Sequence, residues 1–341
     1  MTALRKDCLW RIEKQENKTY AMNVFGECLE YQGEEEVTHG DIILERDSGR
    51  IQKLHDASSS SALVYITNQC NSNCVMCPDS AKQRSRQSNI TEDYLKEYLS
   101  LLPSDLEHVD ITGGEPTLLK DALPEIIEKT MEQTEHAEIL MLSNGRSFAV
   151  KAYTERFAGF SGNRFKIEIP IHSADEAIHD YIAGCLGSFK QTVRGIHNLL
   201  ACRIQVGIRI VVSKLNYQEL ERIIHFIHRE FPQILYVNIM GMEVLGNAWK
   251  NRENVWVEFE EIKPYLENGV KACIESGLNP SLYNFPLCLF EERYWYCYKK
   301  SISDYKIRYF PECGGCREKE KCGGFFFSTF RHTQYKVKVQ V

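Results

Sequence analysis

The sequence lacks the long apolar segments that mark membrane-spanning and secreted proteins. Within its 341 residues there is no run of about 18 apolar residues, so no transmembrane helix is expected. The first eight residues, Met1 to Cys8, contain no apolar secretory core. A net charge of −6 and a pI near 6.0 exclude a basic field that would recruit nucleic acid. These absences predict a cytoplasmic protein with neither a membrane nor a nucleic-acid partner.

The 13 cysteines of the chain are too few and too unevenly placed for a disulfide scaffold. They make up about 4% of the residues, below the roughly 8–10% typical of such scaffolds, and their number is odd. Because cytosolic thiols stay reduced, metal or redox chemistry is the better interpretation. Six cysteines form two clusters, Cys70, Cys74, Cys77 and Cys313, Cys316, Cys322. The other seven are scattered: Cys8, Cys28, Cys185, Cys202, Cys273, Cys288 and Cys297.

The hydrophobic pattern divides the chain into three parts. Residues 1–60 are polar and irregular, with strand-like pieces at residues 20–25 and 42–45. Residues 61–250 alternate short apolar runs with amphipathic helices, which indicates βαβ units and a parallel sheet. The six predicted strands are residues 63–67, 109–112, 139–142, 166–171, 206–212 and 236–240. Six strands are too few for a closed eight-stranded barrel and suit an open partial barrel or a doubly wound sheet.

The predicted helices and the C-terminal part complete this outline. Thr91 is the expected N-cap of a helix whose apolar face includes Leu95 and Leu99. Apolar stripes predict two more helices, at residues 189–200 and 220–231. A fourth is expected near residues 262–276, with Pro264 in its first turn. The remaining C-terminal chain is aromatic and irregular, and such chain commonly depends on a metal site for stability.

Two motifs follow the first two predicted strands. Cys70, Cys74 and Cys77 come directly after the first, where parallel α/β proteins open their active sites. Three thiolates can hold three irons of a cubane cluster and leave one iron open, whereas a zinc knuckle usually closes with a fourth ligand. Gly113-Gly114-Glu115-Pro116 ends the second strand. Paired glycines let backbone groups approach a ligand closely, although this sequence alone is also an ordinary loop.

Together these motifs resemble those of the radical S-adenosylmethionine (radical SAM) superfamily. The resemblance implies a [4Fe–4S] cluster on the three cysteines, whose open iron chelates S-adenosylmethionine (SAM). It also implies that the Gly-Gly-Glu-Pro element touches the SAM amino group. Met76 replaces the usual aromatic residue before the last cysteine, and Ala183 stands where many relatives carry Arg. Further SAM contacts implied by the family are Ser143, Asn144, Glu168, Ser173 and Arg209, each equally compatible with an ordinary loop or strand-end role.

The second cysteine cluster resembles the auxiliary-cluster domains, of twitch or SPASM type, of peptide-modifying radical SAM enzymes. Its spacing is Cys-x2-Cys-x5-Cys, and the expected fourth thiolate is Cys288, with Cys297 as the competing candidate. These ligands predict one auxiliary [4Fe–4S] cluster. Zinc is the alternative, since four thiolates suit Zn²⁺ equally well.

From residue 58 onward most of the chain is similar to the His-Xaa-Ser system radical SAM maturases. The similarity includes Ser58-Ser-Ser-Ser-Ala, Gln191-Thr-Val-Arg-Gly-Ile and Ser301-Ile-Ser-Asp. That family retains the cysteine of its Tyr-Asn-x-x-Leu-Cys stretch, which favours Cys288 over Cys297. Pro78-Asp-Ser is a departure, because those maturases usually carry Ser-Gln-Pro there.

The resemblance implies an enzyme with an N-terminal extension (residues 1–60), a partial (β/α)6 barrel core (61–250) and an auxiliary-cluster domain (251–341). It would cleave SAM reductively to a 5′-deoxyadenosyl radical that abstracts hydrogen from a side chain of a ribosomally made precursor peptide. Expected partners are that peptide, an electron donor of flavodoxin or ferredoxin type and a second radical SAM maturase. The alternatives are a radical SAM enzyme acting on a small molecule or nucleotide and a non-catalytic iron–sulfur subunit. No catalytic acid is assigned, since His172, Glu243 and Tyr283 are all plausible.

Overall fold

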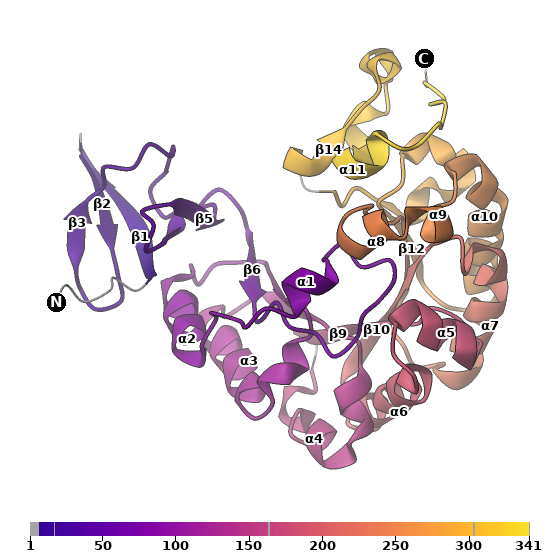
Figure 1. Ribbon diagram of the computed structural model, residues 1–341, viewed down its shortest axis with the longest axis horizontal. Coiled ribbons are helices and arrows are strands. Elements are labelled where there is room, and N and C mark those ends of the chain that lie inside the picture. The colour runs from indigo at the N-terminus through magenta and orange to yellow at the C-terminus, as the bar shows by residue number, and fades with distance from the viewer. Residues whose placement is uncertain (1–6, 17, 163, 303, 341) are drawn as a thin grey trace. The chain divides into compact units, whose positions relative to one another are not determined.

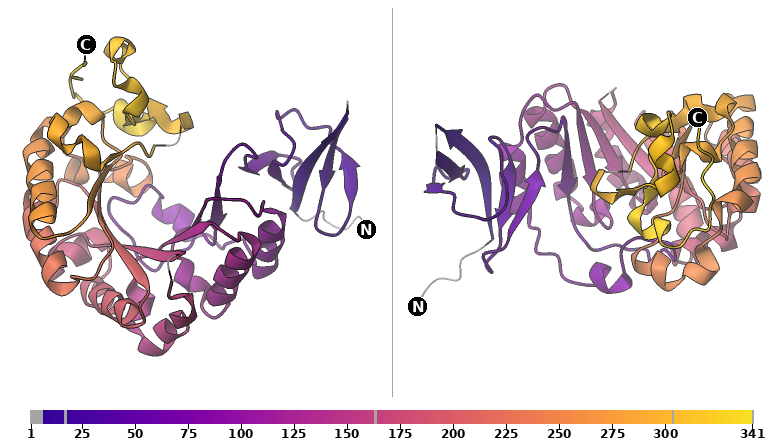
Figure 2. Two further views of the ribbon diagram at one scale, coloured as in Figure 1. Left: turned by 180° about the vertical axis from the view of Figure 1, so that it is seen from behind. Right: turned by 90° about the horizontal axis from the view of Figure 1, so that it is seen from above.

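The computed structural model describes residues 7–340 except 17, 163 and 303, and it divides into two compact units (Figures 1 and 2). Unit 1 comprises residues 1–69, 87–142 and 163–166. Unit 2 comprises residues 70–86, 143–162 and 167–341. No helix of the described residues is long and apolar enough to cross a membrane.

Unit 1 begins with an antiparallel sheet of five strands, drawn in indigo in Figure 1. Its spatial order is β3-β2-β1-β4-β5, and Trp10, Ile12 and Ile43 form the centre of its core. The strand predicted at residues 42–45 is confirmed, and the piece predicted at residues 20–25 overlaps β2. The strands are β1 (Cys8–Gln15), β2 (Lys18–Met22), β3 (Cys28–Glu30), β4 (Ile42–Glu45) and β5 (Ile51–His55).

The rest of unit 1 is a parallel α/β arrangement. Strands β6 (Ser61–Tyr65), β7 (His108–Thr112) and β8 (Glu138–Leu142) pair in parallel. They alternate with helices α2 (Glu92–Leu101) and α3 (Ala122–Gln133). The predicted cap of α2 is confirmed, because the Thr91 side chain accepts a hydrogen bond from the Tyr94 backbone N–H at 3.2 Å. Capping of this kind satisfies one of the backbone donors left open at a helix start.

Unit 2 continues the parallel pattern. Strands β9 to β13 follow one another in hydrogen-bonding order, and together with β6 to β8 of unit 1 they confirm all six predicted strands and the parallel α/β class. The number of strands was underestimated, because β12 and β13 also join the sheet. They are four and two residues long and lie in chain predicted to be irregular, where runs this short give no periodic signal. The strands concerned are β9 (Phe165–Pro170), β10 (Gln205–Val211), β11 (Val237–Met240), β12 (Pro280–Tyr283) and β13 (Tyr298–Lys299).

The helices of unit 2 include one whose start was predicted wrongly. Helix α10 spans Phe259–Glu275, so Pro264 lies in its second turn and not in its first. Burial of Phe259 on the apolar face of the helix stabilises an earlier start. The negative charges of Glu260 and Glu261 in the first turn interact favourably with the helix dipole. The others are α1 (Ala81–Arg84), α4 (Lys151–Glu155), α5 (Glu176–Ala183), α6 (Ser188–Ala201), α7 (Leu220–Glu230), α8 (Gly246–Lys250), α9 (Arg252–Val255) and α11 (Phe327–Phe330).

The C-terminal part of unit 2 is irregular and aromatic, as the sequence predicts. Its regular element is an antiparallel pair of short strands, β14 (Ile307–Arg308) and β15 (Phe325–Phe326). Beneath this pair, Ile302 and Tyr309 contribute to a small apolar cluster. Aromatic side chains such as Phe310 and Phe330 stack around it.

Candidate functional site

The Gly-Gly-Glu-Pro element of unit 1 is fixed against the residues that lead into the first cysteine cluster. The Gly114 N–H donates to Thr67 O at 2.6 Å, and the Glu115 N–H donates to Gln69 O at 2.9 Å. Gln69 directly precedes Cys70 in the sequence. Both glycines are required there, because a Cβ at Gly113 would lie 2.4 Å from Thr67 O and one at Gly114 would lie 2.2 Å from Gln69 O. The close backbone approach expected from the paired glycines is therefore present.

Glu115 and Pro116 shape the chain that follows. The fully buried Glu115 carboxylate accepts hydrogen bonds from the Thr117 backbone N–H at 3.1 Å and from the Thr117 hydroxyl at 2.7 Å. Pro116 begins the short 3₁₀ helix Pro116–Leu119. Glu115 therefore caps the start of this 3₁₀ helix, and the cap fixes the chain directly after the two glycines.

The loop that carries Cys70, Cys74 and Cys77 belongs to unit 2. The Ser72 backbone N–H donates to Cys70 Sγ at 3.4 Å. Burial raises the pKa of the Cys74 thiol to about 12, and the neighbouring Cys77 and Cys70 add to this rise. Burial also raises the pKa of Cys77. Soft thiolates carried on one short loop are the ligands that iron–sulfur clusters use.

Segments distant in sequence hold this loop from several sides. The Asn144 side-chain amide donates to Asn71 Oδ1 at 2.6 Å, and Arg146 Nη1 donates to Ser72 Oγ at 3.1 Å. At the end of α5 the Asn73 N–H donates to Ala183 O at 3.0 Å. Ala183, which stands where relatives carry Arg, therefore contacts the loop through its backbone.

Residues 246–251, here named the α8 clamp, were missed by sequence reasoning. Asn247 Nδ2 donates to Cys74 O, and Asn247 Oδ1 accepts from the Ala81 N–H, both at 3.0 Å. The Ala248 N–H donates to Cys77 O at 3.1 Å. Gly246 has a φ of 51°, and a Cβ there would lie 2.2 Å from Pro78 O. No local sequence pattern predicts these contacts, because they join residues more than 160 positions apart.

Met76 directly precedes Cys77, where the sequence resemblance predicts an aromatic residue. Its side chain is buried in an apolar cluster with Ile182, Met242 and Val244. A flexible thioether adapts to an irregular cavity of this kind. The substitution therefore keeps the loop anchored in the core of unit 2.

A polar network crosses the strands β9, β10 and β11. Glu168 is almost fully buried, and its carboxylate pairs with the Arg209 guanidinium. Asn238 Nδ2 donates to the other Glu168 oxygen at 2.7 Å. Burial, followed by the Glu168 charge, raises the pKa of Tyr236. Buried charges need such pairing, so Arg209 is in this structure the partner of Glu168.

The two remaining serines predicted to contact SAM lie buried at strand ends. Ser143 Oγ accepts the Gly145 N–H at 3.1 Å. Ser173 Oγ accepts the Asp175 N–H at 3.0 Å and donates to Glu219 at 3.4 Å. Both hydroxyls stabilise the turns that follow β8 and β9.

His172 and His179 form a buried pair next to Ser173. Their ring centroids are 5.1 Å apart, and the His172 backbone N–H donates to His179 Nδ1 at 3.2 Å. His172 Nδ1 has no hydrogen-bond partner in the described part of the chain. Burial lowers the pKa of His172 and lowers that of His179 to about 4. Both rings are therefore neutral near pH 7.

Acidification is expected to destabilise unit 2 through this pair. Because the folded pKa of His179 lies below the unfolded value of about 6.5, its contribution is complete above pH 6.5 and is lost as the pH falls towards 4. Between pH 7 and pH 5 the loss from His179 is about 2 kcal/mol. Urea unfolding of wild type and His179→Gln at both pH values measures it. An equal pH dependence in the two proteins would contradict this assignment.

The C-terminal cysteines gather around one pocket. It is lined by Cys288, Cys313, Cys316 and Cys322 among other residues. Burial raises the pKa of Cys313 and Cys322, and Cys288 adds to the rise in both. Cys297 is buried elsewhere, where its thiol donates to Tyr294 O. The structure therefore brings Cys288, and not Cys297, together with the other three cysteines.

Hydrogen bonds and the C-terminal segment complete the walls of this pocket. The N–H groups of Leu287 and Gly324 each donate to Cys322 Sγ at 3.3 Å. The Tyr335 hydroxyl donates to Cys288 O at 3.0 Å. Among the described residues, no three His, Cys, Asp or Glu side chains are arranged to hold a single metal ion.

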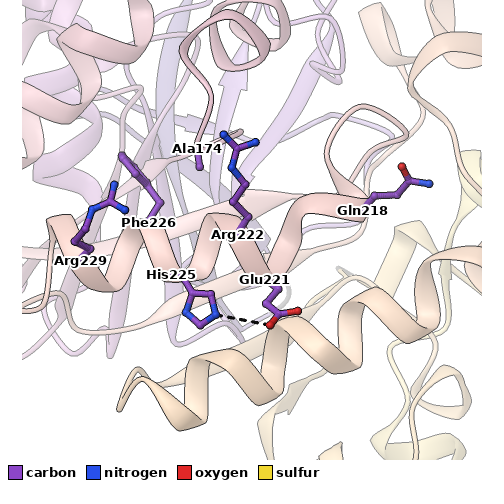
Figure 3. A pocket seen from close by; sticks show the side chains of 7 residues that line it. All are labelled: Ala174, Gln218, Glu221, Arg222, His225, Phe226 and Arg229. Carbon is purple, nitrogen blue, oxygen red and sulfur yellow. Dashed lines mark ion pairs between the residues drawn. The ribbon is translucent and has the colours of Figure 1, made fainter.

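Another pocket lies along α7 (Figure 3). It is lined by Arg222, His225 and Phe226, and His225 pairs with Glu221 at 3.7 Å. None of the residues predicted to bind the cluster or SAM lines it.

Comparison with known proteins gives one family and several relatives. Residues 64–227 match the family model of the radical SAM superfamily. A probable GTP 3′,8-cyclase of Saccharolobus islandicus is 27% identical over 211 residues, which cover 60% of this chain and 63% of the relative. An Fe-coproporphyrin III synthase of Methanosarcina barkeri is 28% identical over 181 residues, covering 51% and 43%. The chain thus spans less than two thirds of the length of these curated relatives.

Solved structures share the fold. SuiB of Streptococcus suis bound to S-adenosylmethionine has a TM-score of 0.51 and 15% identity, covering 66% of this chain and 50% of that chain. SuiB bound to the precursor peptide SuiA has a TM-score of 0.51 and 14% identity, covering 66% and 48%. At this identity the likeness concerns the fold alone.

Proposed function

We propose that the protein is a radical SAM enzyme, with a [4Fe–4S] cluster and SAM as cofactors, that modifies a side chain of a ribosomally synthesised precursor peptide. The match of residues 64–227 to the radical SAM family model supports this proposal. The observation that carries the proposal is the docking of Gly114 and Glu115 on Thr67 and Gln69, immediately before Cys70. This arrangement supports a shared role for the glycine element and the cysteine loop.

Cys70, Cys74 and Cys77 are the proposed ligands of the SAM-binding cluster. Three neighbouring thiols with a donated N–H at Cys70 Sγ fit the donor set that such a cluster needs. When bound and reduced there, the cluster supplies the electron that cleaves SAM to methionine and a 5′-deoxyadenosyl radical. The backbone of Gly113 and Gly114 is proposed to orient the SAM amino group. Asn144 and the α8 clamp keep the loop in its ligating conformation.

Cys288, Cys313, Cys316 and Cys322 are the proposed ligands of an auxiliary [4Fe–4S] cluster. They line one pocket, and two backbone N–H groups point at Cys322 Sγ. Hydrogen bonds to cluster sulfurs tune and stabilise such centres. A cluster held by these four cysteines would supply a redox centre able to take back an electron, or a binding point for the substrate.

A count of iron tests the auxiliary cluster. Since each cubane holds four irons, the reconstituted wild type is expected to bind about eight and Cys288→Ala about four. Cys297→Ala is the matched control, because this buried thiol lies outside the pocket and its removal should leave about eight irons. About four irons with one zinc in the wild type would instead assign the C-terminal site to structural zinc.

Two lines of support favour a peptide substrate. The sequence from residue 58 onward is similar to the His-Xaa-Ser system maturases, through stretches such as Gln191-Thr-Val-Arg-Gly-Ile. The shared fold of SuiB, a protein solved with a precursor peptide, is compatible with the same class of substrate. The proposed partners are accordingly the precursor peptide, a flavodoxin- or ferredoxin-type electron donor and a second radical SAM maturase.

A nucleotide substrate is the second candidate. It is favoured by the 27% identity with a probable GTP 3′,8-cyclase over 211 residues. Both candidates use the same cluster and SAM, and they differ in which molecule loses the hydrogen atom.

Transfer of deuterium distinguishes the two. The reconstituted enzyme is incubated anaerobically with SAM and a reductant, and with either a deuterated His-Xaa-Ser repeat peptide or deuterated GTP. Mass spectrometry of the 5′-deoxyadenosine then reports which substrate donated the atom. Deuterium from the peptide is the expected result, whereas deuterium from GTP alone would replace the peptide with the nucleotide.

A further inference from the structure

Arg84 is a buried cation on the cysteine loop of unit 2. It ends helix α1, and 7% of its surface is exposed. Its Nη2 donates to Asn73 Oδ1 at 2.5 Å, and the same oxygen accepts Asn247 Nδ2 at 3.0 Å. Asn247 also donates to Cys74 O. The α8 clamp and the loop therefore hold the guanidinium in a fixed position.

The Arg84 guanidinium forms no ion pair with a carboxylate of the described residues. None of the ion pairs formed by the described residues includes Arg84. A buried charge without a partner is costly, so an anionic neighbour is expected when the protein is in its working state. Asp79 lies nearby and affects Cys77, but it is partly exposed and forms no ion pair with Arg84.

The anionic neighbours of Arg84 are the cysteines of the loop. Asn73, whose Oδ1 accepts the hydrogen bond from Arg84 Nη2, directly precedes Cys74 in the chain. Asn247 donates both to that same oxygen and to Cys74 O, which ties the guanidinium to the backbone of the cysteine loop. A cation fixed this close to the proposed ligands is suited to balance their charge as thiolates.

We propose that Arg84 is the counter-charge of the SAM-binding cluster and raises its reduction potential, an inference that rests on the cluster ligands proposed above. An iron–sulfur core held by three thiolates is anionic, and one-electron reduction adds a further negative charge. A fixed cation in a partly buried site stabilises the reduced form more than the oxidised form. Arg suits this role because it stays charged under all conditions, and its planar fork is held by Asn73.

A redox titration tests the inference. The full chain is reconstituted anaerobically without SAM or substrate, and the EPR signal that Cys74→Ala removes is followed against potential. Arg84→Gln is expected to lower the equilibrium constant for one-electron reduction at least tenfold, a shift of ~59 mV to more negative potential. Arg84→Lys retains the charge and should keep most of the wild-type potential. Arg86→Gln removes an exposed charge two residues away and should leave the potential unchanged.

The outcomes separate charge from architecture. An unchanged potential in Arg84→Gln overturns the inference, and so do equal shifts in the Lys and Gln variants, which would indicate a purely structural role. If Arg84→Gln takes up no iron, recovery of iron in Arg84→Lys supports the charge role and failure in both overturns it. Absence of the Cys74-dependent signal in the wild type would refute the proposed cluster ligands instead.

Discussion

Cys74→Ala is expected to lose about four of about eight bound irons, together with the EPR signal of the SAM-binding cluster. Cys74 is the central thiol of its loop, and its pKa is raised by burial and by both neighbouring cysteines. Two thiolates cannot hold the three irons that leave one iron open for SAM. The variant should therefore produce no 5′-deoxyadenosine while remaining folded, since the loop is anchored independently by Met76 and the α8 clamp.

The control for this change is a cysteine outside both clusters. Cys202 caps the end of α6 and lines neither group of thiols, so Cys202→Ala should keep the full iron content and the activity. Iron, sulfide and EPR measurements on the three reconstituted proteins provide the comparison. Retention of full iron by Cys74→Ala would contradict the assignment of the first cysteine cluster.

Gly114→Ala is expected to weaken SAM binding at least tenfold. The added Cβ would lie 2.2 Å from Gln69 O and 2.6 Å from Gln69 C, distances that real structures do not show. Because both contacts are backbone atoms, the segment must move and lose the hydrogen bonds from Gly114 to Thr67 and from Glu115 to Gln69. The displaced backbone would lose its proposed hydrogen bond to the charged SAM amino group, which contributes about 1.5–3 kcal/mol, and 1.4 kcal/mol corresponds to ~tenfold in affinity.

Calorimetry with the reconstituted protein measures this effect. Gly159→Ala is the matched substitution, because no atom lies within 4 Å of the Cβ it would introduce. It should bind SAM as the wild type does. Wild-type affinity in Gly114→Ala would show that the glycine element has no part in SAM binding.

The elements that sequence predicted are those determined by local pattern. The strands β6 to β11 are short apolar runs, and the Thr91 cap is a local side-chain contact, so neighbouring residues specify both. Strands β12 and β13 escaped prediction because four and two residues give no periodicity. The N-terminal strands β1, β3 and β5 were also missed, and β3 and β5 are short, largely exposed strands that give weak alternation.

The candidate site divides in the same way. The cysteine spacing and the paired glycines are local signals, and they led to the two central motifs. Arg84 and Asn247 were missed because their roles arise from tertiary contacts, such as the 174 positions that separate Asn247 from Asn73. The spacing of the cysteines alone did not decide between Cys288 and Cys297 as the fourth ligand. The pocket lining favours Cys288. Arg209, expected to contact SAM, forms an ion pair with the buried carboxylate of Glu168.

Formation of 5′-deoxyadenosine tests the central claim most directly. The anaerobically reconstituted full chain is incubated with SAM and dithionite, and the product is quantified by mass spectrometry. The account predicts 5′-deoxyadenosine and methionine in the wild type and in Cys202→Ala, and none in Cys74→Ala. A wild type that contains its cluster and binds SAM but forms no more 5′-deoxyadenosine than Cys74→Ala would contradict it.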